Sequence, residues 1–190
     1  MEWACTDENS GFANRYELDL SELEVVQLSG ADYNILNWLA ILLANRTFRL
    51  SNDLAAEGRD YMLDTYLPDT SYADIIVGYR ADDSYFAFAN AFLNNTLSLE
   101  QLEKAMYLGK LGEQVVLVSE KAFQHIAFTG SEIANRDVYY PLKTERDKEA
   151  RRAYRRESSA RRASDAVYML DILRGGWSND DERLRRNVPG

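Results

Sequence analysis

The sequence is short of the residues that build disulfides and zinc sites. Cys5 is the one cysteine and His125 the one histidine among 190 residues. A single cysteine excludes a disulfide within the chain, and so few sulfur and imidazole ligands argue against a zinc site. Because disulfides are typical of oxidising compartments, this composition favours a reducing one, and we predict a cytoplasmic protein. His125 lies among the apolar residues of 123–128 and is predicted to pack in the core.

Long apolar runs are also absent. The longest extends from Trp38 to Ala44, far short of the roughly 20 residues that a membrane-spanning helix needs. The first residues, Met1 to Ala4, show neither the basic nor the apolar region of a signal peptide. The sequence therefore predicts no membrane span.

The residues that are present describe a globular chain with an uneven charge. Hydrophobic residues make up 46% and aromatic residues 12%, and the net charge is −9. Residues 1–142 contain 9 basic and 22 acidic side chains, a net of −13, whereas residues 143–163 contain 9 basic and 4 acidic ones, a net of +5. An acidic body makes nucleic acid an improbable partner. The basic segment favours an acidic protein partner, or the acidic body of its own chain.

Hydrophobic periodicity and capping signals predict an α+β fold. Predicted strands cover residues 15–20, 23–28, 75–77 and 115–118. Predicted helices cover residues 32–46, 51–65, 83–93 and 98–109. Ser98 and Gln101 have the spacing of a capping box. Residues 75–77 and 115–118 are apolar at successive positions, which is typical of strands buried on both faces. We therefore predict that 115–118 is a central strand and that 75–77 lies in or beside the same sheet.

The chain after Pro141 is rich in alanine and arginine. We predict a helix from Thr144 to about Arg174, with a break near Ser158. Its second half carries an apolar stripe (Ala163, Val167, Leu170 and Leu173) that is expected to dock on the domain or on a second copy. The predicted organisation is an α+β domain at 1–142, a basic helix at 143–175 and a polar tail at 176–190.

Several segments resemble one bacterial family in order and spacing. They are Glu2-Trp3-Ala4, Asn14 to Leu18, Ala73 to Tyr85, Leu97 to Leu102 and Leu108 to Leu117. The family is domain of unknown function 3990, which is related in fold to the ADP-ribosyltransferases. The resemblance covers residues 1–156, most of the chain. It implies an ADP-ribosyltransferase-like partial sheet with flanking helices, followed by the long C-terminal helix.

The resemblance also implies an NAD site that is incomplete in this chain. Family members usually continue upstream, with strands that supply a histidine for the adenosine ribose and an aromatic residue for nicotinamide. Because the sequence begins at Met1, we expect a truncated or internally initiated member that binds NAD weakly or not at all.

One catalytic position of the family is matched. It is an acid that leads into a strand and stabilises the oxocarbenium-like charge as nicotinamide leaves. Glu113 and Gln114 both match it, and Glu113 is the better candidate because a carboxylate stabilises a cationic sugar better than an amide does. The alternative is that Glu113 is a solvated turn residue after Gly112.

A second polar cluster follows the strand predicted at 75–77. It contains Arg80, Asp82 and Asp83, and loops after buried strands often hold sites. Two carboxylates and an arginine suit acid–base chemistry or cation binding. The structural alternative is that one aspartate caps the next helix while Arg80 pairs with a carboxylate.

Two functions from different classes remain open. In the first, the chain is the C-terminal part of an NAD-dependent ADP-ribosyltransferase and is inactive alone. In the second, it is a non-catalytic interaction or regulatory module on a degenerate transferase fold. An upstream reading frame that encodes the missing strands would favour the first. A hydrolase built on Asp82 and Asp83 is less favoured, because the sequence offers no nucleophile and histidine partner beside them.

Overall fold

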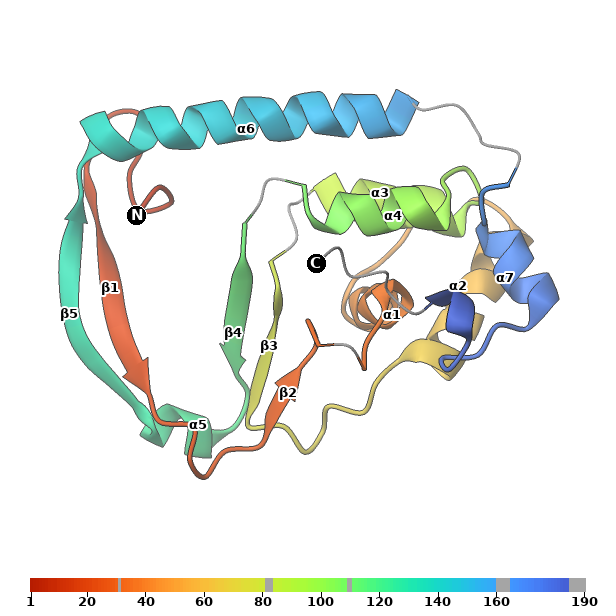
Figure 1. Cartoon of the computed structure of the whole chain (residues 1–190), viewed down its shortest axis with the longest axis horizontal. Helices are drawn as coiled ribbons and strands as arrows, with labels where there is room; N and C mark the ends of the chain where they lie inside the picture. Colours follow the sequence, from red (N-terminus) through yellow and green to blue (C-terminus); the bar gives the residue numbers. More distant parts are fainter. Residues whose placement is uncertain (31, 81–83, 109–110, 160–164, 185–190) are drawn as a thin grey trace.

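The strands lie on one side of the molecule and most of the helices on the other (Figure 1). The computed structural model describes residues 1–30, 32–80, 84–108, 111–159 and 165–184. One sheet pairs β1 (Gly11–Leu18) with β5 (Ile126–Ala134), and the other has the order β2 (Val25–Gln27), β3 (Ile75–Tyr79), β4 (Glu113–Leu117). Helices and small sheets in this arrangement confirm the predicted α+β class.

The helices divide into a packed group and two connecting elements. The packed group contains α1 (Ile35–Asn45), α2 (Asp53–Tyr66), α3 (Ser84–Leu93), α4 (Leu99–Met106) and α7 (Met169–Gly175). The short helix α5 (Glu120–Gln124) joins β4 to β5, and α6 (Arg136–Ser159) crosses above both sheets (Figure 1). A single turn of 3₁₀ helix, η1 (Glu182–Leu184), follows α7.

Local capping signals account for several helix starts. Ser98 and Gln101 form the predicted capping box at α4. Helix α1 begins at Ile35, three residues after the start of the predicted range 32–46, and Asn34 is its N-cap. The Asn34 side chain accepts a hydrogen bond from the backbone N–H of Leu36 at 2.9 Å, which satisfies a donor that the helix leaves unpaired.

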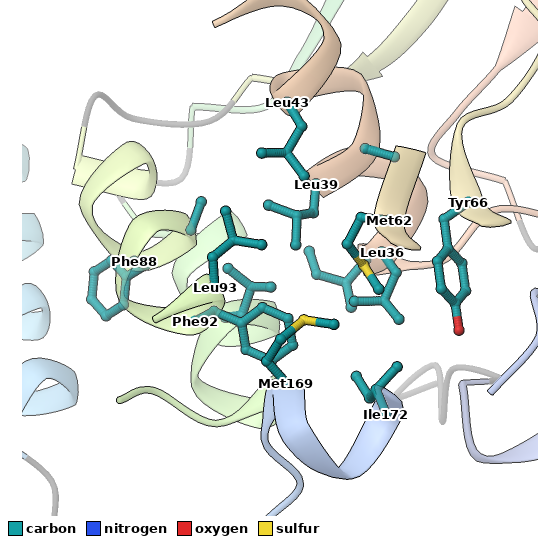
Figure 2. Close-up of a cluster of buried hydrophobic side chains, with 14 of the residues drawn as sticks. Leu36, Leu39, Leu43, Met62, Tyr66, Phe88, Phe92, Leu93, Met169 and Ile172 are labelled. Atoms are coloured by element: carbon teal, nitrogen blue, oxygen red, sulfur yellow. The ribbon is translucent and has the colours of Figure 1, made fainter. Parts of the chain in front are cut away.

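The main hydrophobic core lies between the five packed helices. Figure 2 shows side chains from α1, α2, α3 and α7 pointing toward one another, among them Leu36, Leu39, Met62, Phe92, Met169 and Ile172. Full burial of each such side chain contributes on the order of 1.5–3 kcal/mol. The helical half therefore holds most of the hydrophobic stabilisation of the chain.

The C-terminal segment joins this core, which corrects the predicted polar tail. Trp177 and Leu184 are both buried in it. The hydroxyl groups of Tyr61 and Tyr66 donate hydrogen bonds to the carbonyl oxygen of Trp177, at 2.9 and 2.5 Å. The prediction overlooked these residues because isolated apolar residues in a polar segment give no periodic signal.

The long C-terminal helix is two helices. Helix α6 begins at Arg136 and includes Pro141, whereas the prediction began the helix after that proline. Proline is tolerated because it lies near the start of the helix and removes only one backbone hydrogen bond. Helix α6 ends at Ser159, close to the predicted break. Helix α7 then packs on α2, where Met169 lies against Gly58.

The predicted apolar stripe of the second half is only partly described. Ala163 lies outside the described residues, and Val167, Leu170 and Leu173 are half-buried. The fully buried residues of α7 are its neighbours Met169 and Ile172. The segment therefore docks on its own domain through a face one position away from the predicted one.

The strands at 75–77 and 115–118 share one sheet, as predicted. Strand β4 runs antiparallel to β3, with Val116 opposite Ile76. The prediction that 115–118 is central and buried on both faces is wrong, because β4 is the edge strand of the described sheet and Val115, Val116 and Val118 are 52%, 43% and 51% exposed. Trp38 of α1 packs over β2 and β3, so the helical layer does not cover β4.

The β1–β5 pair is a two-stranded ribbon whose residues are mostly exposed. Strand β5 was not predicted, and β1 begins four residues before the predicted strand. The large apolar side chains Phe12, Tyr16, Phe128 and Ile133 are all exposed. Tyr16 and Phe128 meet edge to face with ring centroids 5.6 Å apart. Isolated two-stranded ribbons are only marginally stable in water.

Candidate functional site

Glu113, the acidic candidate, is the first residue of β4. Its side chain is hydrogen-bonded by residues that lie on the other side of β3, at the end of β2. Its carboxylate accepts hydrogen bonds from the Ser29 hydroxyl and from the Gln27 side-chain amide, the latter at 3.3 Å. Gln27 ends β2, so residues from both neighbours of β3 meet at one end of the sheet. The Glu113 side chain remains exposed. The carboxylate is thus oriented by two donors and open to a ligand.

The side chain of Gln114, the second candidate, lies on a different surface. It lines a cavity of about 750 Å³ together with Trp38, Tyr79, Tyr85, Phe86 and Met106. Successive side chains of a strand point to opposite faces of the sheet, and Gly78, which pairs with Gln114, lies against the Trp38 ring. Glu113 and Gln114 therefore cannot serve one small ligand on the same face.

Arg80 belongs to an unpredicted basic and aromatic group, here called the Trp3 cluster (Trp3, Arg80, Lys143 and Arg146). The guanidinium groups of Arg80 and Arg146 each lie 4.9 Å from the Trp3 ring centroid, and the Lys143 ammonium lies 5.3 Å from it. Such cation–π contacts contribute about 0.5–1 kcal/mol each at exposed sites. Asp82 and Asp83, the other members of the predicted polar cluster, lie outside the described residues.

The Trp3 cluster lies beside the start of β4. The backbone N–H of Arg80 donates a hydrogen bond to the Gly112 carbonyl at 2.9 Å, one residue before Glu113. From the other side, Arg146 of α6 forms an ion pair with Glu2 at 2.5 Å. The N-terminal turn, the end of β3 and α6 thus meet next to the acidic candidate, and they bring positive charge to it.

A smaller cavity on α6 is also lined by basic side chains. It has a volume of about 400 Å³ and lies between α6 and the end of α4, with Arg146, Arg152, Arg156, Glu149 and Tyr107 in its wall. Three guanidinium groups against one carboxylate leave a positive balance. This wall is the most basic one among the described cavities, and it suits an anionic group.

The junction of β2, β3 and α5 contains an ionised aspartate that the sequence analysis did not single out. Asp74 accepts a hydrogen bond from the Ser119 hydroxyl at 2.5 Å and another from the Glu24 backbone N–H at 2.9 Å. The Ser119 hydroxyl, then the Glu24 N–H, hold the pKa of the Asp74 carboxyl below its usual value, and Lys121 at 3.8 Å acts in the same direction. Asp74 therefore fixes the strand ends in place.

His125 ends α5 and is half-buried rather than part of the core. The prediction of a core histidine fails because its aromatic neighbours Phe123 and Phe128 are exposed. Within the described ranges, no group of three or more histidine, cysteine, aspartate or glutamate residues is placed to hold a metal ion. The described helices also include none that is long and apolar enough to cross a membrane.

Comparison with known proteins gives one match. No curated protein and no solved structure matches the chain. The model of the family described as "Protein of unknown function (DUF3990)" matches residues 1–128, somewhat less than the stretch inferred from the sequence. That range contains β1 to β4, α5 and Glu113. Since it is more than half of the sequence, the chain belongs to the DUF3990 family.

Proposed function

We propose that this chain supplies the acidic part of an NAD-dependent ADP-ribosyl-transfer site, with Glu113 as the acid, and that it is inactive alone. The observation that carries the proposal is the oriented and exposed carboxylate of Glu113 at the start of β4. The resemblance to ADP-ribosyltransferases supplies the reaction class. Gln114 is the weaker candidate, because its side chain lines the other cavity.

The chemistry requires a carboxylate at a fixed place. When the bond between nicotinamide nitrogen and ribose carbon breaks, the bonding electrons leave with nicotinamide and positive charge develops on the ribose. A carboxylate that accepts a hydrogen bond from the 2′-hydroxyl stabilises that charge best when it is oriented in advance. Ser29 and Gln27 provide this orientation. The positive charge of the Trp3 cluster suits the diphosphate of NAD.

The same geometry explains why we expect no turnover. The two cavities described above are lined by Gln114 and by α6, and neither contains Glu113. A nucleotide at Glu113 would therefore keep much of its surface in water, whereas tight sites bury most of a ligand. NAD should accordingly bind to this chain weakly at most.

Two measurements test the proposal. Nuclear magnetic resonance should show amide shifts at Gln27, Ser29 and Glu113 on addition of millimolar nicotinamide mononucleotide, which contains the nicotinamide ribose. AMP, which lacks it, should leave these three amides unchanged. The absence of such shifts, or equal shifts with AMP, would show that Glu113 does not contact this ribose.

The second measurement is nicotinamide release from NAD. The purified chain should give none above background. Release that disappears in Glu113→Ala would support the role of Glu113 but would contradict the proposal that the chain is inactive alone.

A second candidate function is a non-catalytic protein-interaction module. The specific observation is the exposed apolar surface of β4, β1 and β5. Monomeric soluble proteins rarely expose large contiguous apolar patches, and such patches mark interaction sites.

A further inference from the structure

Within the part of the chain that the structure describes, the outer edge of β4 presents a regular array of backbone groups that do not bond to β3. The Val118 N–H donates to the Asp74 carbonyl at 2.8 Å, and the Arg80 N–H donates to the Gly112 carbonyl at 2.9 Å. Because hydrogen bonding alternates along an antiparallel pair, even-numbered residues of β4 bond to β3. Glu113, Val115 and Leu117 therefore direct their N–H and C=O groups away from β3, to the open edge of the described sheet.

The side chains along this edge are apolar on both faces. Val115 and Val116 point to opposite faces of the sheet, and both are exposed, as is Val118. Tyr16 and Phe128 of the β1–β5 ribbon are exposed as well. Proteins normally protect an edge strand with charges, a proline or a covering element. The described part of β4 has only Glu113 for this purpose, at its first position.

Other elements surround the open edge of β4. In Figure 1, β1 lies on the open side of β4, α6 passes above it and α5 lies below it. A second copy of the chain would have to bring its whole sheet and helices to an edge that β1, α5 and α6 already surround, whereas an extended segment would bring a single strand. Two copies would also each carry a net charge of −9, which disfavours self-association.

We propose that the open edge of β4 binds an extended apolar segment of another polypeptide, with basic residues at the end that lies near α5, as an added β-strand. Strand addition obtains affinity from main-chain hydrogen bonds and specificity from alternate side chains. Around α5, at the Val118 end of the edge, the acidic residues Asp19, Glu22, Glu24, Asp74 and Glu120 outnumber Lys121, which favours lysine or arginine at that end of the apolar segment. This inference rests on the interaction-module function and is independent of whether Glu113 acts on NAD.

Val115 allows a clean test, because its N–H faces the open edge. Val115→Pro removes that donor and leaves the bonds between β3 and β4 in place, since proline is tolerated at strand edges. Val115→Thr is the matched control: it keeps the N–H and a β-branched side chain. The probe is a fluorescent synthetic peptide of alternating valine and threonine with two lysines at each end. A control peptide carries N-methylated amides throughout its valine–threonine segment.

The experiment measures fluorescence anisotropy in titrations with the full chain and no nucleotide. Wild type and Val115→Thr should bind the probe with saturation, and Val115→Pro should bind it roughly tenfold or more weakly. The N-methylated peptide should not bind. Thermal melting of each variant checks its fold, and the N-methylated peptide tests the edge without changing the protein.

Three results would overturn the proposal. The first is a lack of saturable binding to the wild-type chain, and the second is equal binding of both peptides. The third is a wild-type dimer in sedimentation velocity that Val115→Pro dissociates, since it would assign the edge to a second copy. Each of these leaves the nicotinamide mononucleotide experiment unaffected.

Discussion

The same residue type is buried in the helical half of this chain and exposed in its strand half. Phe92 of α3 is 0% exposed within the helical core, whereas Phe128 of β5 is 60% exposed on the ribbon. Burial of apolar area contributes roughly 25 cal/mol per Å² to folding, so the helices stabilise the fold and the strands add little. The strand half instead presents apolar faces, an open edge and the Glu113 carboxylate.

The residues that stabilise the fold and the residues proposed to act in function therefore lie in different halves of the molecule. The helical core is built from side chains of five helices and the C-terminal segment, and Figure 2 shows part of it. The strands are positioned by that core through β2 and β3, and by α6 above them (Figure 1). Mutations in the two halves should therefore affect different measurements.

The largest expected effect compares the two phenylalanines. Phe92→Ala should lower the free energy of unfolding by about 3–5 kcal/mol, because it removes buried contacts and leaves a cavity. Phe128→Ala, the same substitution on the exposed ribbon, should change it by no more than about 1 kcal/mol, since it removes only a cross-strand pair with Tyr16. Urea denaturation followed by circular dichroism measures both. Similar losses for the two variants would contradict the division into a helical half that stabilises the fold and a strand half that contributes little stability.

An intermediate effect tests whether α7 belongs to the helical half. Met169→Ala should lower the free energy of unfolding by about 2–3 kcal/mol, because Met169 is fully buried against α2. Leu170→Ala is the matched control: Leu170 is half-buried, and its backbone N–H keeps its 3.1 Å bond to the Asn95 side chain. We expect less than about 1 kcal/mol there. An equal loss in the two variants would place the docking face elsewhere on α7.

The smallest expected effect concerns acid sensitivity in the strand half. The pKa of Asp74 is lowered in the folded chain, first by the Ser119 hydroxyl and then by the Glu24 N–H. A lowered folded-state pKa stabilises the fold above the unfolded-state pKa, and this stabilisation is lost as the pH falls through the folded-state value. Ser119→Ala should raise the pKa of Asp74 toward its usual value, so that the folded carboxyl is protonated at a higher pH and the acid-dependent loss of stability becomes smaller.

Carboxyl titration by nuclear magnetic resonance measures this shift directly. Ser119→Thr keeps the hydroxyl and should keep the low pKa of Asp74. Since Ser119 also caps α5, Ser119→Ala should lower stability at every pH, and the Asp74 pKa separates the two effects. An unchanged Asp74 pKa in Ser119→Ala would mean that the hydroxyl does not act on this carboxyl.

Local signals in the sequence predicted the helical half well. The capping box at Ser98 and the apolar spacing of residues 32–46 involve residues three or four positions apart, and these neighbours meet in any helix. The candidate site was predicted less completely. Glu113 was identified by resemblance, but its partners Gln27 and Ser29 lie 86 and 84 residues away and carry no signal of their own. The Trp3 cluster was missed for the same reason, since α6 supplies two of its cations.

The sequence by itself determined which segments become helices and which valine-rich run becomes β4, because propensity and periodicity act over a few residues. Only the tertiary structure decided that β4 lies at an edge, that β5 pairs with β1, and that Trp177 and Leu184 enter the core. Burial on both faces of a strand depends on what the rest of the chain places beside it. Here α1 covers β2 and β3 but does not cover β4. The valines of β4 therefore remain exposed beside Glu113.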